Sequence, residues 1–406
     1  MRHHIAACGV ALAAAALVFA GGSSTASAAI PQTAQADAAL RYLYAQVGAD
    51  GSIAASMGAT EDTVIAVADN GYDPATLRNA SSGASAYGYL AAHASAVSTA
   101  GGAAKYVLAW LAAGRPATIP ARPLLTRLNA PVRAGGFLNP NGTFHDPSAA
   151  VETANAYSQS LAVLADLAAG VSLPRHAAGW LVCAQRPDGG FGYAIDDGTP
   201  APPALCGDTS SDTNDTGIVL QALGRAAVTS VDSTALGYLH SAQQPDAGFG
   251  FTAAGPSDPD SDAVVIQALV ATGQDPTASF WTVGTANPVT DMESFAAPSG
   301  GYAFPGNTTA DAFTTAPVPQ ALALDPYGAA TSVVPGSSPP PPPPPPSPSP
   351  RPSPTPAATA AASPSPTVPV PATGEGTAIP VPLLLVALGG LGVAAAAVGR
   401  RARPSP

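Results

Sequence analysis

The chain has 406 residues, of which 46% are hydrophobic and only 10% are charged, and its formal net charge is −11. The single lysine is Lys105 and the arginines form no basic stripe, so the composition argues against nucleic acid as a partner. The length allows one large domain or two ordinary domains once the two ends of the chain are set aside.

Residues 1–28 are predicted to be a secretory signal peptide. Positions 2–4 form a short polar start, and positions 5–20 form an apolar stretch that is short for a membrane span. Positions 26–28 are small residues suited to cleavage before Ala29. The mature protein is therefore expected to be exported.

Export would leave two cysteines, because Cys8 lies inside the predicted signal peptide. An even pair in an exported chain favours one disulfide between Cys183 and Cys206, with two unpaired thiols as the alternative. The bridge would close a loop of about 23 residues, worth about 3 kcal/mol if it acts by restricting the unfolded chain.

A glycine–aromatic turn recurs along the chain and predicts its architecture. The middle residues of its copies, Gly136, Gly190, Gly248 and Gly301, follow one another at intervals of 54, 58 and 53 residues. A long period of this kind is typical of stacked copies of one supersecondary unit. The four turns are Gly135-Gly136-Phe137, Gly189-Gly190-Phe191, Ala247-Gly248-Phe249 and Gly300-Gly301-Tyr302.

Each turn is predicted to join two helices into a hairpin, since Gly and then Pro follow the second helix as stop signals. Two weaker copies come first, with turns at Asp50-Gly51 and Gly101-Gly102, so six hairpins are expected between positions 34 and 326. Helical hairpins must pack on their neighbours to bury their apolar faces. The expected helices include 39–46 and 63–70, 84–94 and 105–113, 177–185 and 216–223, and 235–243 and 262–271.

The repeat resembles that of the squalene cyclase and protein prenyltransferase β-subunit superfamily. The resemblance is carried by Trp180-Leu181, Gln185 and Gly190-Phe191, and again by Tyr238-Leu239, Gln243 and Gly248-Phe249. It implies an all-α fold for residues 29–334, an α6/α6 terpenoid cyclase-like toroid whose inner helices surround a central cavity. Phe stands where the superfamily motif ends in Trp, and one fold of this kind hosts many chemistries.

The segment Asp212-Thr213-Asn214-Asp215-Thr216 is similar to the D-x-D-D-T acid motif of squalene–hopene and related class II terpene cyclases. The resemblance implies a proton donor at the middle acidic position, but Asn214 stands there and has no acidic proton. Asp212, Asp258 and Asp311 each precede a leucine by 11 residues. A carboxylate repeated at a helix start favours capping. Asp212 and Asp215 are therefore weak candidates, and the catalytic residues stay unknown.

No metal or cofactor is predicted. Prenyltransferases bind zinc through Asp, Cys and His, whereas Cys206 and Asp208 have neither the right order nor a matching His. Asp258, Asp260 and Asp262 alternate as calcium ligands could, but the glycine and glutamate of an EF-hand loop are missing. Helix capping and solvated charge explain these aspartates without a metal.

The C-terminal end resembles the LPxTG sorting signal of Gram-positive bacteria. Residues 335–369 form a linker rich in Pro, Ser and Ala, expected to be a disordered, semi-rigid stalk. Val370-Pro371-Ala372-Thr373-Gly374 follows, with Val370 where the signal has Leu. Next come an apolar run at 379–398, long enough for a transmembrane helix, and a basic tail at 399–406 that should stay cytoplasmic.

The sorting signal implies that a sortase cuts between Thr373 and Gly374 and joins the chain to the cell wall; a retained membrane anchor is the alternative. With export at one end and anchoring at the other, the sequence predicts a surface-displayed binding or interaction module at the cell envelope. Its ligand, a lipid, a glycan or a protein, is left open. The alternative is an enzyme that uses the toroid cavity, either of the terpene cyclase or prenyltransferase type or acting on glycans.

Overall fold

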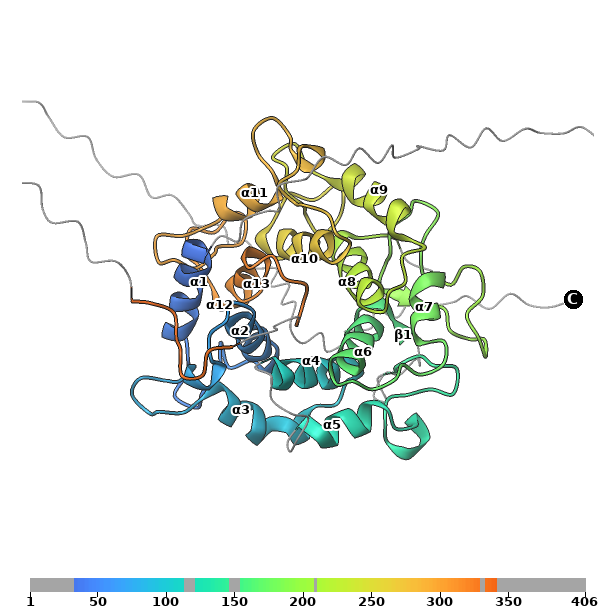
Figure 1. Ribbon diagram of the computed structural model, residues 1–406, viewed down its shortest axis with the longest axis horizontal. Helices are drawn as coiled ribbons and strands as arrows, with labels where there is room; N and C mark the ends of the chain where they lie inside the picture. The colour runs from blue at the N-terminus through green and yellow to red at the C-terminus, as the bar shows by residue number, and fades with distance from the viewer. Residues whose placement is uncertain (1–32, 113–120, 146–153, 208–209, 329–332, 342–406) are drawn as a thin grey trace, which may run out of the picture.

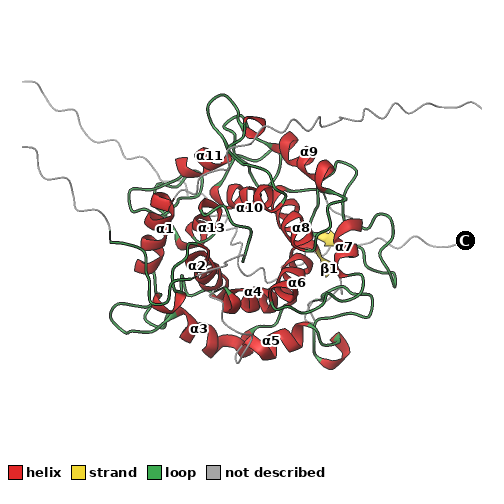
Figure 2. Ribbon diagram, in the orientation of Figure 1, coloured by secondary structure: helices red, strands yellow, loops and turns green. Residues whose placement is uncertain are grey.

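The computed structural model describes residues 33–112, 121–145, 154–207, 210–328 and 333–341. These residues form an outer ring of helices around an inner ring, both centred on one axis (Figures 1 and 2). The predicted signal peptide, the sorting motif and the apolar run at 379–398 lie outside the described residues. Within the described ranges, no helix combines the length and the apolar character needed to cross a membrane.

The described helices alternate between the two rings along the chain. The inner ring holds α2 (Met57–Asp69), α4 (Ala100–Leu111), α6 (Ala156–Ala168), α8 (Thr213–Arg225), α10 (Pro259–Ala271), and the short pair α12 (Ala312–Thr315) and α13 (Val318–Leu322). The outer ring holds α1 (Thr33–Ala45), α3 (Ala86–His93), α5 (Ala121–Leu128), α7 (Ala177–Cys183), α9 (Asp232–Ala242) and α11 (Pro288–Ser294). The mostly helical toroid expected from the repeat is therefore present.

Short non-α elements complete the described chain. Strands β1 (Ala154–Asn155) and β2 (Ala194–Ile195) pair antiparallel, with Ala154 opposite Ile195. The all-α prediction did not include them. Single turns of 3₁₀-helix occur at Pro74–Thr76, Ala94–Ala96, Val132–Ala134 and Ser279–Trp281.

A polar side chain caps the start of each inner helix in the described chain except α13, where Pro317 holds the cap position. Asp212 Oδ1 accepts a hydrogen bond from the Asp215 N–H at 2.7 Å, and Asp258 and Asp311 do the same for Ser261 and Thr314. Ser56, Thr99 and Asn155 cap the other three inner helices. Capping satisfies a backbone N–H that the helix leaves without a partner.

A second hydrogen bond ties each of five caps to the turn before it. Four residues after the cap, a side chain accepts from the backbone N–H of the buried turn residue; Thr216 Oγ1 accepts from Phe191 N at 2.9 Å. The same bond joins Thr60 to Ile53, Gln159 to Phe144, Asp262 to Phe249 and Thr315 to Tyr302, at 2.7–2.9 Å. The turn aromatic is thereby held between the two rings, where the aromatic side chains are fully buried.

These bonds correct two of the predicted turns. In the third repeat the turn is Gly142-Thr143-Phe144 rather than Gly135-Gly136-Phe137. Gly135 and Gly142 both have a positive φ, but it is Phe144 that makes the bond to the inner helix. In the second repeat Gly101 and Gly102 lie in the first turn of α4, capped by Thr99, and make no turn.

Contacts between the first and last repeats close the ring. Helix α13 contacts both α1 and α2, so each inner helix has an inner neighbour on both sides. Tyr42 donates a hydrogen bond from its hydroxyl to the Ala310 carbonyl at 2.8 Å, and Asn70 Nδ2 donates to the Pro319 carbonyl at 2.9 Å. Of the closed ring and the open solenoid that six hairpins allow, the chain adopts the closed ring.

The first residues of the predicted linker lie against the ring. The Val334 N–H donates to the Gly71 carbonyl at 3.0 Å, and the Asp73 N–H donates to the Ser337 carbonyl at 3.1 Å. Arg41 Nη1 donates to the Pro340 carbonyl. The packed part of the chain therefore extends beyond residue 334, over the end of the ring at which α2 finishes.

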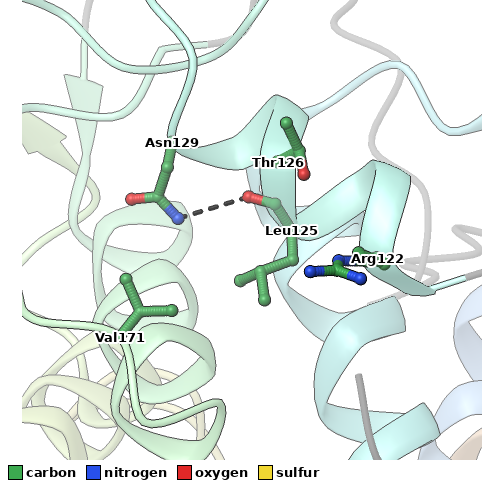
Figure 3. Close-up of a pocket in the computed structure, with 5 residues that line it drawn as sticks. All are labelled: Arg122, Leu125, Thr126, Asn129 and Val171. Atoms are coloured by element: carbon green, nitrogen blue, oxygen red, sulfur yellow. Dashed lines mark hydrogen bonds between the residues drawn. The ribbon is translucent and has the colours of Figure 1, made fainter. Parts of the chain in front are cut away.

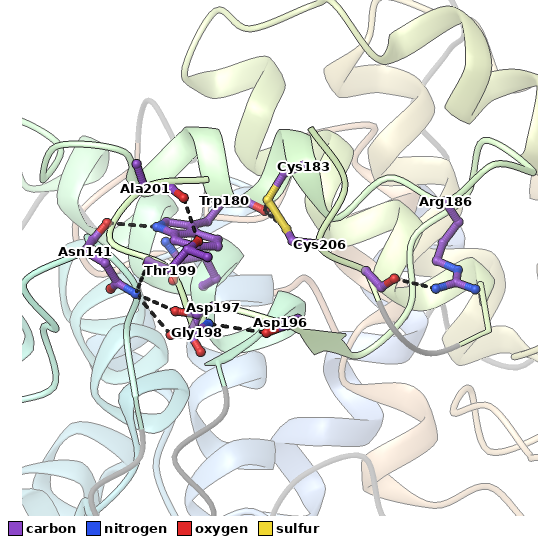
Figure 4. The surroundings of a disulfide bond; sticks show 12 residues. Asn141, Trp180, Cys183, Arg186, Asp196, Asp197, Gly198, Thr199, Ala201 and Cys206 are labelled. Carbon is purple, nitrogen blue, oxygen red and sulfur yellow. Dashed lines mark hydrogen bonds between the residues drawn. A yellow bond between two sulfur atoms is a disulfide. The ribbon is translucent and has the colours of Figure 1, made fainter. Parts of the chain in front are cut away.

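A disulfide joins Cys183, the last residue of α7, to Cys206, with 5.2 Å between their Cα atoms (Figure 4). The loop between them is also held by Asp197. This carboxylate accepts from His145 Nε2 at 2.6 Å and from Thr143 Oγ1 at 2.7 Å. The bridge and this polar cluster attach a loop that has little apolar surface of its own.

Replacing both cysteines by alanine should lower the free energy of unfolding by about 3 kcal/mol, because the open loop gains freedom mainly in the unfolded chain. Urea denaturation of the C183A/C206A double variant measures the loss. Alkylation of the unreduced protein, read by mass spectrometry, should label neither cysteine. Labelling of both cysteines would show that the disulfide is absent. A double variant as stable as the parent would show that the disulfide does not stabilise the fold.

Candidate functional site

A charged pair lies at the axis of the ring. Lys105 Nζ on α4 donates to Asp62 Oδ2 on α2 at 2.7 Å, and only 9% of the lysine side chain is exposed. The Tyr327 hydroxyl donates to the other oxygen, Asp62 Oδ1, at 2.8 Å. Burial is the largest single influence and lowers the pKa of Lys105. The charges of Asp62, Tyr157 and Glu61 and the hydrogen bond to Asp62 together outweigh burial and raise this pKa, so the ammonium stays charged.

Tyr327 belongs to a segment that crosses the axis after α13 (Figure 1). Its backbone N–H donates to Gln221 Oε1 on α8 at 2.8 Å, and Arg225 Nη1 donates to the Gly328 carbonyl at 3.3 Å. The last repeat is thus bonded across the ring to the fourth. The end of the ring at which the inner helices finish is partly covered by this segment.

Several carboxyl groups surround the pair. Burial raises the pKa of Glu61 well above its usual range, although nearby Lys105 opposes the shift. Burial, and then the charges of Asp258, Asp311 and Asp62, raise the pKa of Asp260. Burial also raises the pKa of Tyr157 on α6, yet 37% of this residue is exposed, so water reaches it.

The two predicted candidates, Asp212 and Asp215, form a buried carboxyl pair at the start of α8. Burial, and then the charge of Asp212, raise the pKa of Asp215 well above its usual range. The charge of Asp215 also raises the pKa of Tyr157, so Asp215 lies near the titratable groups at the axis. Asp212 is held by its capping bond, in the same way as Asp258 and Asp311.

The described residues provide no group of three or more His, Cys, Asp or Glu side chains that could hold a metal ion. Cys206 is in the disulfide, and Asp208 lies outside the described residues. Among the histidines, His145 bonds Asp197 and His240 stacks on Phe280 with ring centres 4.3 Å apart. The sorting residues Val370 to Gly374 lie outside the described part of the chain.

Two open depressions lie away from the axis. The first, of about 440 Å³, is lined by Arg122, Leu125, Thr126 and Asn129 on and after α5, and by Val171 after α6 (Figure 3). The second, of about 360 Å³, lies beside the disulfide loop and includes Asn141 and Asp197. Neither gathers the groups that surround Lys105.

No protein-family model and no curated protein sequence matches the chain. Among solved structures, the type II terpene cyclase MstE from Scytonema, bound to geranylgeranyl dihydroxybenzoate, is 12% identical, with a TM-score of 0.47 over 72% of this chain and 96% of that one. A protein from Actinoplanes is 15% identical, with a TM-score of 0.47 over 73% and 99%.

An inactive variant of an α-1,6-mannanase from a Salegentibacter species, bound to α-1,6-mannotriose, is 12% identical, with a TM-score of 0.49 over 72% of this chain and 98% of that one. Likenesses of this degree assign no function. They include proteins that act on isoprenoid compounds and on glycans, so the site has to be interpreted from its own residues.

Sequence reasoning missed most of the axial groups. Lys105 stood out only as the single lysine, and Asp62 and Tyr327 carry no motif. Asp62 lies 43 positions before Lys105, on the neighbouring inner helix, and Tyr327 reaches Asp62 only because the ring closes. A lone lysine inside an Ala-rich helix was the one available signal, since a buried ammonium needs a carboxylate partner.

The capping role of Asp212 can be tested against its counterpart. Asp212→Ala and Asp258→Ala should each lower the free energy of unfolding by about 1 kcal/mol, the usual cost of a lost N-cap. Asp212→Asn should keep most of the stability, because an amide oxygen also caps. Thermal unfolding of the three variants provides the comparison. Loss of an activity with Asp212→Ala alone would instead make the fourth repeat an active site.

Asp166, near the end of α6, gives a pH-dependent prediction. Burial raises its pKa to about 6, although a hydrogen bond from Asn129 opposes the shift. Because the pKa of Asp166 is higher in the folded than in the unfolded chain, the protonated carboxyl group stabilises the fold fully below about pH 4. This contribution to the free energy of unfolding is lost as the pH rises through about 6. Asp166→Asn removes this loss, so the variant should exceed the parent by about 2–3 kcal/mol at pH 7 and match it near pH 4. Urea denaturation of parent and variant at pH 4 and pH 7 measures the two free energies of unfolding. The same difference between parent and variant at both pH values would contradict the prediction.

Proposed function

We propose that the chain is a binding module displayed at the cell envelope, with the ring as its binding domain. The proposal is carried by the axis, where Asp62 pairs with Lys105 and Tyr327, and Gln221 and Arg225 bond the segment that follows α13. These groups form hydrogen bonds and an ion pair with one another and so hold the ring together. In a toroid enzyme the same central position would hold the substrate; here structural contacts occupy it.

The charge at the axis argues against an isoprenoid substrate. Cyclisation of such a substrate needs an apolar chamber with aromatic faces that stabilise cations. Here a buried ammonium, Lys105, lies among the carboxyl groups of Asp62, Glu61 and Asp260. A positive charge fixed at the axis would repel a carbocation, and the acid of the cyclase motif is replaced by Asn214.

Display rests on the two ends of the sequence. The predicted signal peptide at 1–28 directs export, and the LPxTG-like signal at 370–374 with the apolar run at 379–398 provides the anchor. The Pro-rich linker between them would separate the ring from the envelope as a semi-rigid spacer. The ring would then be presented outside the cell.

A glycan-active enzyme is the second candidate, and one observation favours it. Asp215 and Asp260 lie on neighbouring inner helices, the pKa of each is raised, and Tyr157 between these groups and Lys105 is open to water. Carboxyl groups kept protonated near neutral pH are suited to general acid catalysis. Release of reducing ends from a polysaccharide, lost in Asp215→Asn or Asp260→Asn, would favour this candidate.

Two measurements on the full chain test the proposed function. In expressing cells, fractionation should place the protein in the envelope, and protease added to intact cells should digest the ring. Full chain purified in mild detergent should convert neither squalene nor geranylgeranyl diphosphate to a cyclised product. Release of the whole chain into the medium would remove the display part of the proposal, and a cyclised product would remove the binding-module part.

A further inference from the structure

A second aromatic residue follows the buried turn aromatic in the last three repeats. Two positions after Phe191, Phe249 and Tyr302, all buried, stand Tyr193, Phe251 and Phe304. These three side chains are 50%, 50% and 43% exposed. Large aromatic side chains are costly to leave in water, so three exposed ones at equivalent repeat positions mark an interaction surface.

Backbone bonds place this aromatic row at the starts of the inner helices. The Ala156 N–H, at the first residue of α6, donates to the Tyr193 carbonyl at 2.7 Å. The Thr213 N–H, at the first residue of α8, donates to the Phe251 carbonyl at 3.1 Å. Phe304 holds the equivalent position in the sixth repeat, so the row follows one face of the ring.

That face is opposite the one on which the linker packs. The inner helices α8 and α10 run parallel, because Gly217 lies beside Val264 near their starts and Gly224 lies beside Ala271 near their ends. The starts of the inner helices therefore lie at one end of the ring. The linker bonds to Asp73, which follows α2 at the other end, so the aromatic row faces away from these described linker residues.

The size of the row selects an extended ligand. Packed helices are about 8–10 Å apart, so on a closed ring of six the outermost of three successive positions are separated by about 14–17 Å. A single small molecule cannot touch all three. A polymer chain lying across the starts of α6 to α10 can.

The charge of the face selects against an anionic polymer. In the described parts of segments 186–212, 244–260 and 297–311, which carry the row, the exposed charged side chains are Asp188, Asp196 and Asp246, and the one basic residue is Arg186. The guanidinium of Arg186 is bonded to the Gly207 carbonyl. Asp188 and Asp246 lie exposed in the turns. Acidic polysaccharides, nucleic acids and anionic lipid surfaces would be repelled.

We propose that Tyr193, Phe251 and Phe304 bind a neutral polysaccharide chain across this face. A pyranose ring presents C–H groups on its faces, which carry slight positive charge and stack on the negative faces of aromatic rings. Its hydroxyl groups donate to carboxylates such as Asp188 and Asp246, which accept without needing a charged partner. The proposal rests on the binding function proposed above and names the ligand class of that domain.

The test uses full chain in mild detergent and a panel of insoluble neutral polysaccharides: cellulose, curdlan, mannan and starch granules. The parent should bind at least one of them. The triple variant Tyr193→Ala, Phe251→Ala, Phe304→Ala should bind about 1,000-fold more weakly, since one aromatic contact at a binding surface is worth about tenfold and the three sites are separate. Exchange within the aromatic class (Y193F, F251Y, F304Y) should keep most of the affinity.

Phe280→Ala is the matched control. Phe280 is similarly exposed, at 47%, but stacks on His240 of α9 in the outer ring. This variant should bind polysaccharide as the parent does. Thermal unfolding of all variants shows whether the ring stays folded, and a triple variant that fails to fold is replaced by the three single variants, each expected to lose about tenfold.

Salt separates a neutral glycan from a cationic protein, the other ligand that an acidic aromatic face could take. Polysaccharide binding should change little between about 0.05 and about 0.5 M NaCl, whereas binding to a cationic partner should fall steeply. Equal binding by the parent and the triple variant would overturn the proposal. Binding to isolated envelopes without binding to any neutral polysaccharide would overturn the proposed ligand class but not the binding module. Binding to neither envelopes nor polysaccharides would overturn the proposed function as well.

Discussion

Five of the six repeats share one hydrogen bond, from the backbone N–H of the buried turn residue to the side chain four positions after the helix cap. Phe191 to Thr216 and Phe249 to Asp262 show it with two different acceptors. The bond satisfies a donor that would otherwise be buried unpaired, at a cost of about 1–3 kcal/mol. It also sets the depth at which the aromatic ring enters the space between the two helix layers.

Because this bond sits at the turn, the two faces of the ring differ. The turn face carries the caps, the exposed carboxylates and the aromatic row, whereas the opposite face receives the linker at Gly71 and Asp73. A repeat array that closes into a ring has no free ends to cap with polar surface. The two faces can therefore differ: one packs against the start of the linker, and the other exposes the aromatic row.

Ring closure also completes the hydrogen bonding of the buried ion pair at the axis. An ammonium in the interior is tolerated only with a paired carboxylate and further hydrogen bonds. Asp62 provides the carboxylate, and Tyr327 satisfies its other oxygen. Lys105 and Asp62 lie on the neighbouring helices α4 and α2, so their pair needs no closure of the ring. The bond from Tyr327, which follows the last inner helix, does need it and therefore favours the closed arrangement over an open solenoid.

The sequence by itself determined the repeat, its helical hairpins and the capping positions, because spacing and turn chemistry are local properties. It placed Asp212, Asp258 and Asp311 at helix starts from their common distance to a leucine. It misassigned the third turn because Gly135-Gly136-Phe137 matches the pattern better than Gly142-Thr143-Phe144, and only the bond from Phe144 to Gln159 distinguishes them. Tertiary structure alone decided which side chains meet at the axis, because Asp62 and Lys105 lie on different inner helices and Tyr327 comes from the last repeat. It also decided that Tyr193, Phe251 and Phe304 are exposed, since the aromatic two positions earlier takes the buried place in every one of those turns.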